Sequence, residues 1–110
     1  MDAFKLKCGT LIVFHGGSDA LRGKMIDHCN VDGFIWDYTY EEVRQFPFNP
    51  YYWEFGCGEE YILNNRHECY IPRLEDVLSD LKPSGTGIML EIKGEGMVQD
   101  VIDMVERMGM

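Results

Sequence analysis

The sequence is poor in positive charge. It contains 10 lysines and arginines against 19 aspartates and glutamates, which gives a formal net charge of −9. Binding to nucleic acid requires a basic surface that faces the phosphates, and anionic membranes attract basic segments. The composition therefore argues against both kinds of partner. An acidic protein that handles a phosphate group usually does so with a metal cation or with a few well-placed basic side chains.

Long apolar runs and paired cysteines are also missing. No apolar segment approaches the roughly 20 residues of a membrane-spanning helix, and we recognise no signal peptide. The four cysteines contain no CxxC pair and show no zinc-like spacing with the three histidines. We therefore expect free thiols, a reducing compartment and a cytoplasmic protein without a transmembrane segment. The cysteines are Cys8, Cys29, Cys57 and Cys69.

The residues that are present suit one globular domain. Hydrophobic residues make up 45% of the 110 positions and charged residues 26%, values that are ordinary for a folded domain. A chain of this length buries very roughly 65% of the surface that its unfolded form exposes. We treat residues 1–110 as one domain, with an insertion-like region at about residues 18–70.

The N-terminal residues predict a β-hairpin. Residues 4–7 alternate apolar and basic side chains, and residues 10–14, with the sequence TLIVF, are apolar and β-branched. Between them, Cys8 and Gly9 are typical of a turn. A strand, a tight turn and a second strand are therefore expected here.

A histidine follows the second expected strand. His15 precedes Gly16 and Gly17, and glycines allow the backbone to approach a ligand closely. This arrangement is typical of a functional site at the end of a strand. It fits equally well a histidine whose hydrogen bonds are satisfied within the fold, so the local sequence leaves both interpretations open.

The region from 18 to 70 contains one firm local signal. Thr39 followed by Glu42 is a capping box, so we expect a short helix over residues 39–45. The aromatic cluster at residues 46–55 either stacks a ligand or forms a small secondary core, and the second interpretation is favoured. We interpret three further residues of this region as structural or solvated: His28, Cys29 and His67.

The last third of the chain predicts a helix, a strand and another helix. Apolar side chains recur at helical spacing in residues 74–81 and again in residues 97–108. Between them, residues 88–92 form a short apolar run, which we expect to be a strand covered on both faces. Glu91 and Lys93 interrupt this run at its C-terminal end. Because functional sites of α/β folds lie at the C-terminal ends of strands, this unit is expected to deliver both side chains to a site.

Three segments together resemble the glycerophosphodiester phosphodiesterase family. Residues 1–17, MDAFKLKCGTLIVFHGG, are similar to the family's metal-binding strand, turn and histidine-ending strand. Residues 38–45, YTYEEVRQ, are similar to a short helix in the family's insertion. The segments IPRLEDVLSDL and LEIKG resemble the helix and strand that present its Glu-x-Lys motif. The resemblance implies an α/β fold that is part of a TIM barrel, with a β-hairpin, a long insertion with a short helix, and a helix–strand–helix unit.

The resemblance also implies roles for four residues. Asp2 and Glu91 match metal ligands, Lys93 matches a phosphate-binding lysine, and His15 matches one of two catalytic histidines. The implied cofactor is a divalent metal, calcium or magnesium, and the implied substrate is a glycerophosphodiester. The implied activity is that of a phosphoric diester hydrolase of lipid metabolism, which releases glycerol 3-phosphate and an alcohol. Phosphoinositide-type phospholipases share such a barrel, but the LEIKG strand fits them less well.

The sequence departs from the family pattern in several places. The family's His-Arg-Gly motif and the first Glu of its metal motif are absent, and Gly16 replaces an Asp. A complete TIM barrel needs about 250 residues. We therefore expect a partial domain with little or no diesterase activity by itself, and self-association through exposed strand edges. The alternative is a catalytically inactive barrel fragment that acts as an interaction or regulatory piece.

Overall fold

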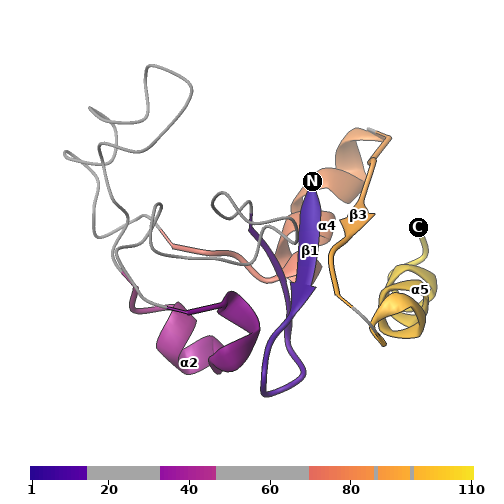
Figure 1. Ribbon diagram of the computed structural model, residues 1–110. Coiled ribbons are helices and arrows are strands. Elements are labelled where there is room, and N and C mark those ends of the chain that lie inside the picture. The colour runs from indigo at the N-terminus through magenta and orange to yellow at the C-terminus, as the bar shows by residue number, and fades with distance from the viewer. Residues whose placement is uncertain (15–32, 47–69, 86, 95) are drawn as a thin grey trace, which may run out of the picture.

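The structure, a computed structural model, is a small α/β fold in which helices flank a mixed sheet (Figure 1). It describes residues 1–14, 33–46, 70–85, 87–94 and 96–110. Within these ranges the elements in chain order are β1 (Asp2–Lys5), β2 (Leu11–Val13), η1 (Ile35–Asp37), α2 (Tyr40–Val43), α4 (Leu74–Leu81), η3 (Lys82–Ser84), β3 (Glu91–Ile92) and α5 (Val98–Arg107).

The predicted β-hairpin is confirmed. β1 pairs antiparallel with β2, with Phe4 opposite Ile12. The turn closes through a hydrogen bond of 2.9 Å from the Leu6 amide to the Thr10 carbonyl. Gly9 has a φ of +93° in this turn, a conformation that glycine adopts without steric cost. The alternating pattern and the turn residue therefore account for this part of the fold.

β1 is the central strand of the sheet, because β3 pairs with its other edge in parallel and the order is β2-β1-β3. The Glu91 amide donates to the Met1 carbonyl at 2.8 Å, and the Lys93 amide donates to the Ala3 carbonyl at 3.0 Å. Parallel strands need a long crossover connection. Here the chain between β1 and β3 includes β2, α2 and α4.

One face of the sheet packs against α4 and α5. Ala3 of β1 is fully buried in a cluster with Leu74 and Leu78 of α4 and Val101 of α5. Ile92 of β3 is partly buried against the same cluster. The 3.6-residue spacing of the apolar side chains in α4 places Leu74 and Leu78 on one side of the helix, so the predicted helix is confirmed.

The opposite face of the sheet packs against η1 and α2, which lie on the other side of the sheet from α5 (Figure 1). Phe4 and Ile12 point to this side, into a second cluster that includes Ile35 and Val43. The predicted capping box is present, because the Thr39 hydroxyl accepts from the Glu42 amide and the Glu42 carboxylate accepts from the Thr39 amide.

In the last third of the chain the expected final helix is confirmed as α5 (Val98–Arg107), whereas the expected burial of the strand is wrong. The hydrogen-bonded part of β3 is only two residues long, and Met89 in the expected strand is 84% exposed. Within the described ranges the helices cover one side of this strand only, so it is not buried on both faces. In α5, Met97 and Val101 are buried as expected, but Val98 and Ile102 are exposed, because only one side of the helix contacts the sheet.

Several sequence predictions lie outside the described residues. These predictions concern His15, the part of the insertion-like region at residues 18–32, and the aromatic cluster at residues 46–55, of which only Phe46 is described. Phe46 itself packs edge-on against Tyr38, with ring centroids 4.9 Å apart, beside the cluster around Phe4. The other residues that fall outside the description are His28, Cys29, Cys57, His67 and Cys69.

Candidate functional site

The fold places Asp2 beside Glu91. The two residues are direct partners in the register of β1 and β3, although they come from opposite ends of the chain. Ala3 and Ile92 are the next pair, and both contact the cluster under α4 and α5. Because side chains alternate along a strand, Asp2 and Glu91 lie on the face away from these helices. This convergence of two carboxylates is the main polar feature of that end of the sheet.

Lys93 adds a positive charge to the same face. Its ammonium forms an ion pair with the Glu91 carboxylate, with a separation of 2.9 Å between Nζ and Oε2. The Glu91 carboxylate accepts hydrogen bonds from Lys93 and from Asp2, and these bonds and the positive charge of Lys93 hold the pKa of Glu91 below its ordinary value. Glu91 is therefore a carboxylate at neutral pH, and its Oε2 atom is held by Lys93.

Burial separates the two acids. The Asp2 residue is 7% exposed, whereas the Glu91 side chain is 59% exposed. Asp2 is enclosed because β1 is the central strand, whereas Glu91 lies on an outer strand of the described sheet. Strand order, which is a tertiary property, decided which acid is buried.

The end of β2 approaches the same place. The Phe14 amide donates to the Asp2 carbonyl at 3.1 Å. Phe14 immediately precedes His15 in the sequence, and His15 itself lies outside the described residues. Three of the four predicted site residues are therefore described, and the structure brings Asp2, Glu91 and Lys93 together.

Two carboxylates form part of a coordination shell. Calcium and magnesium take oxygen ligands, with carboxylates foremost among them, so Asp2 and Glu91 suit such a cation in chemical type. Within residues 1–14, 33–46, 70–85, 87–94 and 96–110, no group of three or more His, Cys, Asp or Glu side chains is placed to hold a metal ion. A cation at this position would take its remaining ligands from water, substrate or other residues.

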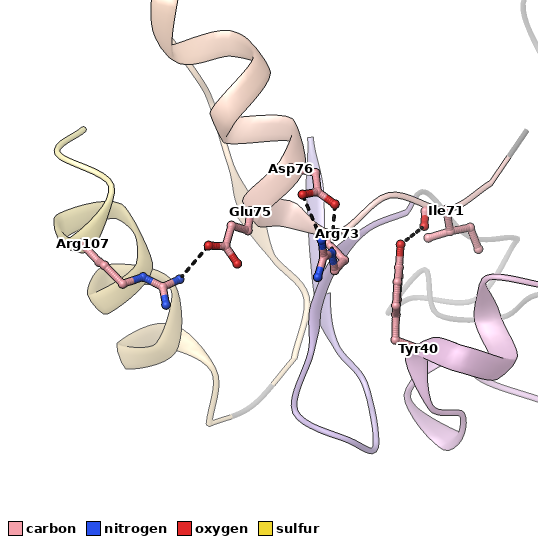
Figure 2. A network of polar contacts seen from close by, with 6 residues as sticks. All are labelled: Tyr40, Ile71, Arg73, Glu75, Asp76 and Arg107. Atoms are coloured by element: carbon pink, nitrogen blue, oxygen red, sulfur yellow. Dashed lines mark hydrogen bonds and ion pairs between the residues drawn. The ribbon is translucent and has the colours of Figure 1, made fainter. Parts of the chain in front are cut away.

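A second polar region, which the sequence did not suggest, lies at the hairpin-turn end of the sheet. Figure 2 shows Arg107 of α5 reaching Glu75 of α4, at 3.4 Å, and Arg73 paired with Asp76 at 2.9 and 3.2 Å. Arg73, Glu75 and Arg107 border a cavity of about 440 Å³. The arginines already have carboxylate partners within the chain, so this cavity offers a ligand no uncompensated charge from them. Its lining residues are Gly9, Thr10, Leu11, Tyr40, Arg73, Glu75, Asp100, Asp103, Met104 and Arg107.

Cys8 in the hairpin turn is an exposed free thiol. The hydrogen bond with the Thr10 hydroxyl, at 3.3 Å, and the Thr10 and Tyr40 amides lower the pKa of Cys8 below its ordinary value of 9.0. Since the thiolate is the reactive form, Cys8 is expected to react with iodoacetamide faster at pH 8 in the native chain than in the Thr10→Val variant. The two rates should converge above pH 9. Peptide mass spectrometry resolves Cys8 from the other cysteines, and equal rates at pH 8 would contradict the assignment.

Searches against protein-family models and against curated proteins find no match to this chain. In the part of the chain that the structure describes, no helix is both long and apolar enough to cross a membrane. The class that the structure defines is a small α/β fold with a three-stranded mixed sheet and flanking helices.

Proposed function

We propose that this chain is part of a metal-dependent phosphodiesterase barrel of the glycerophosphodiester phosphodiesterase type. The supporting observation is the register of Asp2 with Glu91, and the ion pair of Glu91 with Lys93. These are the residues that the resemblance assigns to the metal and the phosphate. Asp2 is distant in sequence from Glu91 and Lys93, and only the pairing of β1 with β3 brings it beside them.

The arrangement of layers is consistent with a segment of barrel wall. β1 and β3 are parallel, and α4 and α5 both pack on one face, as helices do on the outside of a TIM barrel. Asp2 and Glu91 lie on the opposite face, which would correspond to the inside. Further along β1 this face carries Phe4, which packs against η1 and α2. β2 is antiparallel to β1, and we assign the β1–β2 hairpin to an extension beyond the barrel strands.

Each residue has a role in the proposed chemistry. Asp2 and Glu91 would hold a divalent cation, which supplies neutralisation of the phosphate's negative charge. Lys93, which pairs with Glu91 in this structure, would contact a phosphate oxygen as a point charge. We assign to His15 the transfer of a proton to or from the departing alcohol oxygen, because histidine titrates near neutral pH.

Cation binding tests the carboxylate pair directly. Isothermal titration of the purified chain with calcium and then magnesium is expected to show binding that weakens about tenfold or more in the Glu91→Gln variant, since one of two carboxylate ligands is lost. The matched control is Glu75→Gln, an exposed acid that pairs with Arg107 on the helix side. It should bind the cation as the native chain does. Equal weakening of cation binding in both variants, or no weakening in either, would rule out Asp2 and Glu91 as a ligand pair.

Phosphate recognition is tested with glycerol 3-phosphate, the product of the proposed reaction, in the presence of calcium. Lys93→Met is expected to weaken its binding because a cation facing the phosphate is removed. Lys7→Met, which removes an exposed lysine near the hairpin turn, serves as the control. If both variants bind the phosphate as tightly as the native chain, Lys93 has no role in recognition.

A further inference from the structure

β3 has a second edge with backbone groups that point away from β1. In a parallel pair, the residues that bond to the neighbouring strand alternate with residues whose N–H and C=O face the other way. Glu91 and Lys93 bond to β1, so Leu90 and Ile92 direct their N–H and C=O groups to the other edge. In the described residues no strand pairs there, and β3 ends the sheet order.

The side chains of this edge carry a self-complementary pattern of charge. Glu91 and Lys93 have opposite charges, are two residues apart and lie on the same face of the sheet. When two copies of such a strand pair antiparallel about a two-fold axis at Ile92, Glu91 of each copy lies opposite Lys93 of the other. Cross-strand pairs of opposite charge stabilise a sheet, and like charges directly opposite destabilise it.

We propose that β3 pairs antiparallel with β3 of a second copy of this chain, in the register that places Ile92 opposite Ile92. Two independent features select this register. The outward N–H and C=O groups of Ile92 make Ile92 with Ile92 a hydrogen-bonded pair. Glu91 with Lys93 of the partner subunit then becomes a non-hydrogen-bonded pair, in which side chains approach more closely.

The neighbouring symmetric register is less favourable. Pairing about Leu90 also uses outward-facing backbone groups, but it places Glu91 opposite Met89 and leaves Lys93 opposite Gly87. That arrangement forms no charge pair. The Ile92-centred register is thus the one in which the backbone hydrogen bonds and the charges agree.

Exposed apolar side chains favour association at this part of the molecule. Met89, just before β3, is 84% exposed, and Leu90 borders an apolar cleft of about 300 Å³ between α4, α5 and the strand. Strand pairing about an axis normal to the sheet brings both α5 helices to the same face. This inference rests on the geometry of β3 in residues 1–110 and does not depend on a bound cation. In a complete barrel of the proposed type, a further strand would take the edge that joins the two copies here.

The oligomeric state, measured by light scattering or sedimentation over a concentration series in EDTA, tests the proposal. The native chain is expected to dimerise, and Glu91→Lys to raise the dimer dissociation constant about tenfold, because both cross-strand pairs become repulsive. This weakening is expected although the substitution reduces the net charge of −9. The double variant with Glu91→Lys and Lys93→Glu restores opposite charges and should restore the dimer. Glu75→Lys changes the net charge equally on α4 and should leave the dimer intact.

Amide exchange identifies the surface. When the chain is diluted and the dimer fraction falls, hydrogen exchange of the Leu90 and Ile92 amides should accelerate at least in proportion. The Glu91 and Lys93 amides, which bond to β1, should stay protected. A native chain that remains a folded monomer throughout the series would overturn the proposal. So would a dimer that Glu91→Lys leaves unchanged, or one in which the Leu90 and Ile92 amides exchange equally fast at all concentrations. If a single variant fails to fold by circular dichroism, the native exchange pattern still decides the proposal.

Discussion

Phe4→Ala is expected to lower the free energy of unfolding by about 3–5 kcal/mol, as removal of a buried aromatic ring does in other cores. Phe4 is 1% exposed at the centre of β1. Its ring lies 6.4 Å from that of Phe14 and 6.1 Å from that of Trp36, between centroids. The substitution therefore leaves a cavity where β1, β2 and η1 meet.

This loss is comparable in size to the total free energy of unfolding of a small domain. Small domains unfold with about 5–15 kcal/mol, so the Phe4→Ala variant should show a large fall in its urea midpoint or be unfolded without denaturant. Circular dichroism during urea unfolding measures this. Val98→Ala, at a position that is 53% exposed, is the matched control and should change stability by less than about 0.5 kcal/mol. A Phe4→Ala midpoint equal to that of the native chain would contradict the packing described for β1.

The second large effect concerns Asp2, for which stability and cation binding should respond in opposite ways. Asp2 is buried in register with Glu91 and donates a hydrogen bond to its carboxylate, and burial of an ionised acid costs free energy. In EDTA, Asp2→Asn should therefore melt at the same temperature as the native chain or higher. The asparagine amide keeps a hydrogen-bond donor beside Glu91.

With calcium the order is expected to reverse. A cation that binds only the folded chain stabilises it by about 2.7 kcal/mol at a hundredfold excess over its dissociation constant. The melting temperature of the native chain should rise accordingly, whereas that of Asp2→Asn should not change. Asp80→Asn, an exposed acid on α4, should retain the full calcium response. A variant at Asp2 that is less stable in EDTA but still responds to calcium would show that Asp2 is structural and not a ligand.

The elements that the sequence predicted correctly are those with local causes. The alternation in residues 4–7 and the turn at Gly9 specify the hairpin, because strand period and φ preference act within a few residues. Thr39 and Glu42 specify the start of α2 through bonds between neighbours. The spacing of apolar residues over 74–81 specifies α4.

The strand at residues 88–92 shows where local reasoning stops. A short apolar run has no period that distinguishes a strand buried on both faces from one buried on one face. Which faces of Met89 and Leu90 are covered depends on where α4, α5 and any neighbouring strand lie. The same applies to α5, whose apolar stripe includes Val98 and Ile102, because the packing leaves both side chains exposed.

The sequence by itself therefore determined the hairpin, the capped α2 helix, the amphipathic α4 helix and the chemical types of the candidate site residues. Only the tertiary structure decided that Asp2 lies in register with Glu91, that Asp2 and not Glu91 is buried, and that β3 keeps an edge with the charge pattern of Glu91 and Lys93. The physical reason is that capping, turn and periodicity signals act between residues close in the chain. Parallel strand pairing joins residues from its two ends, and no local signal records its register.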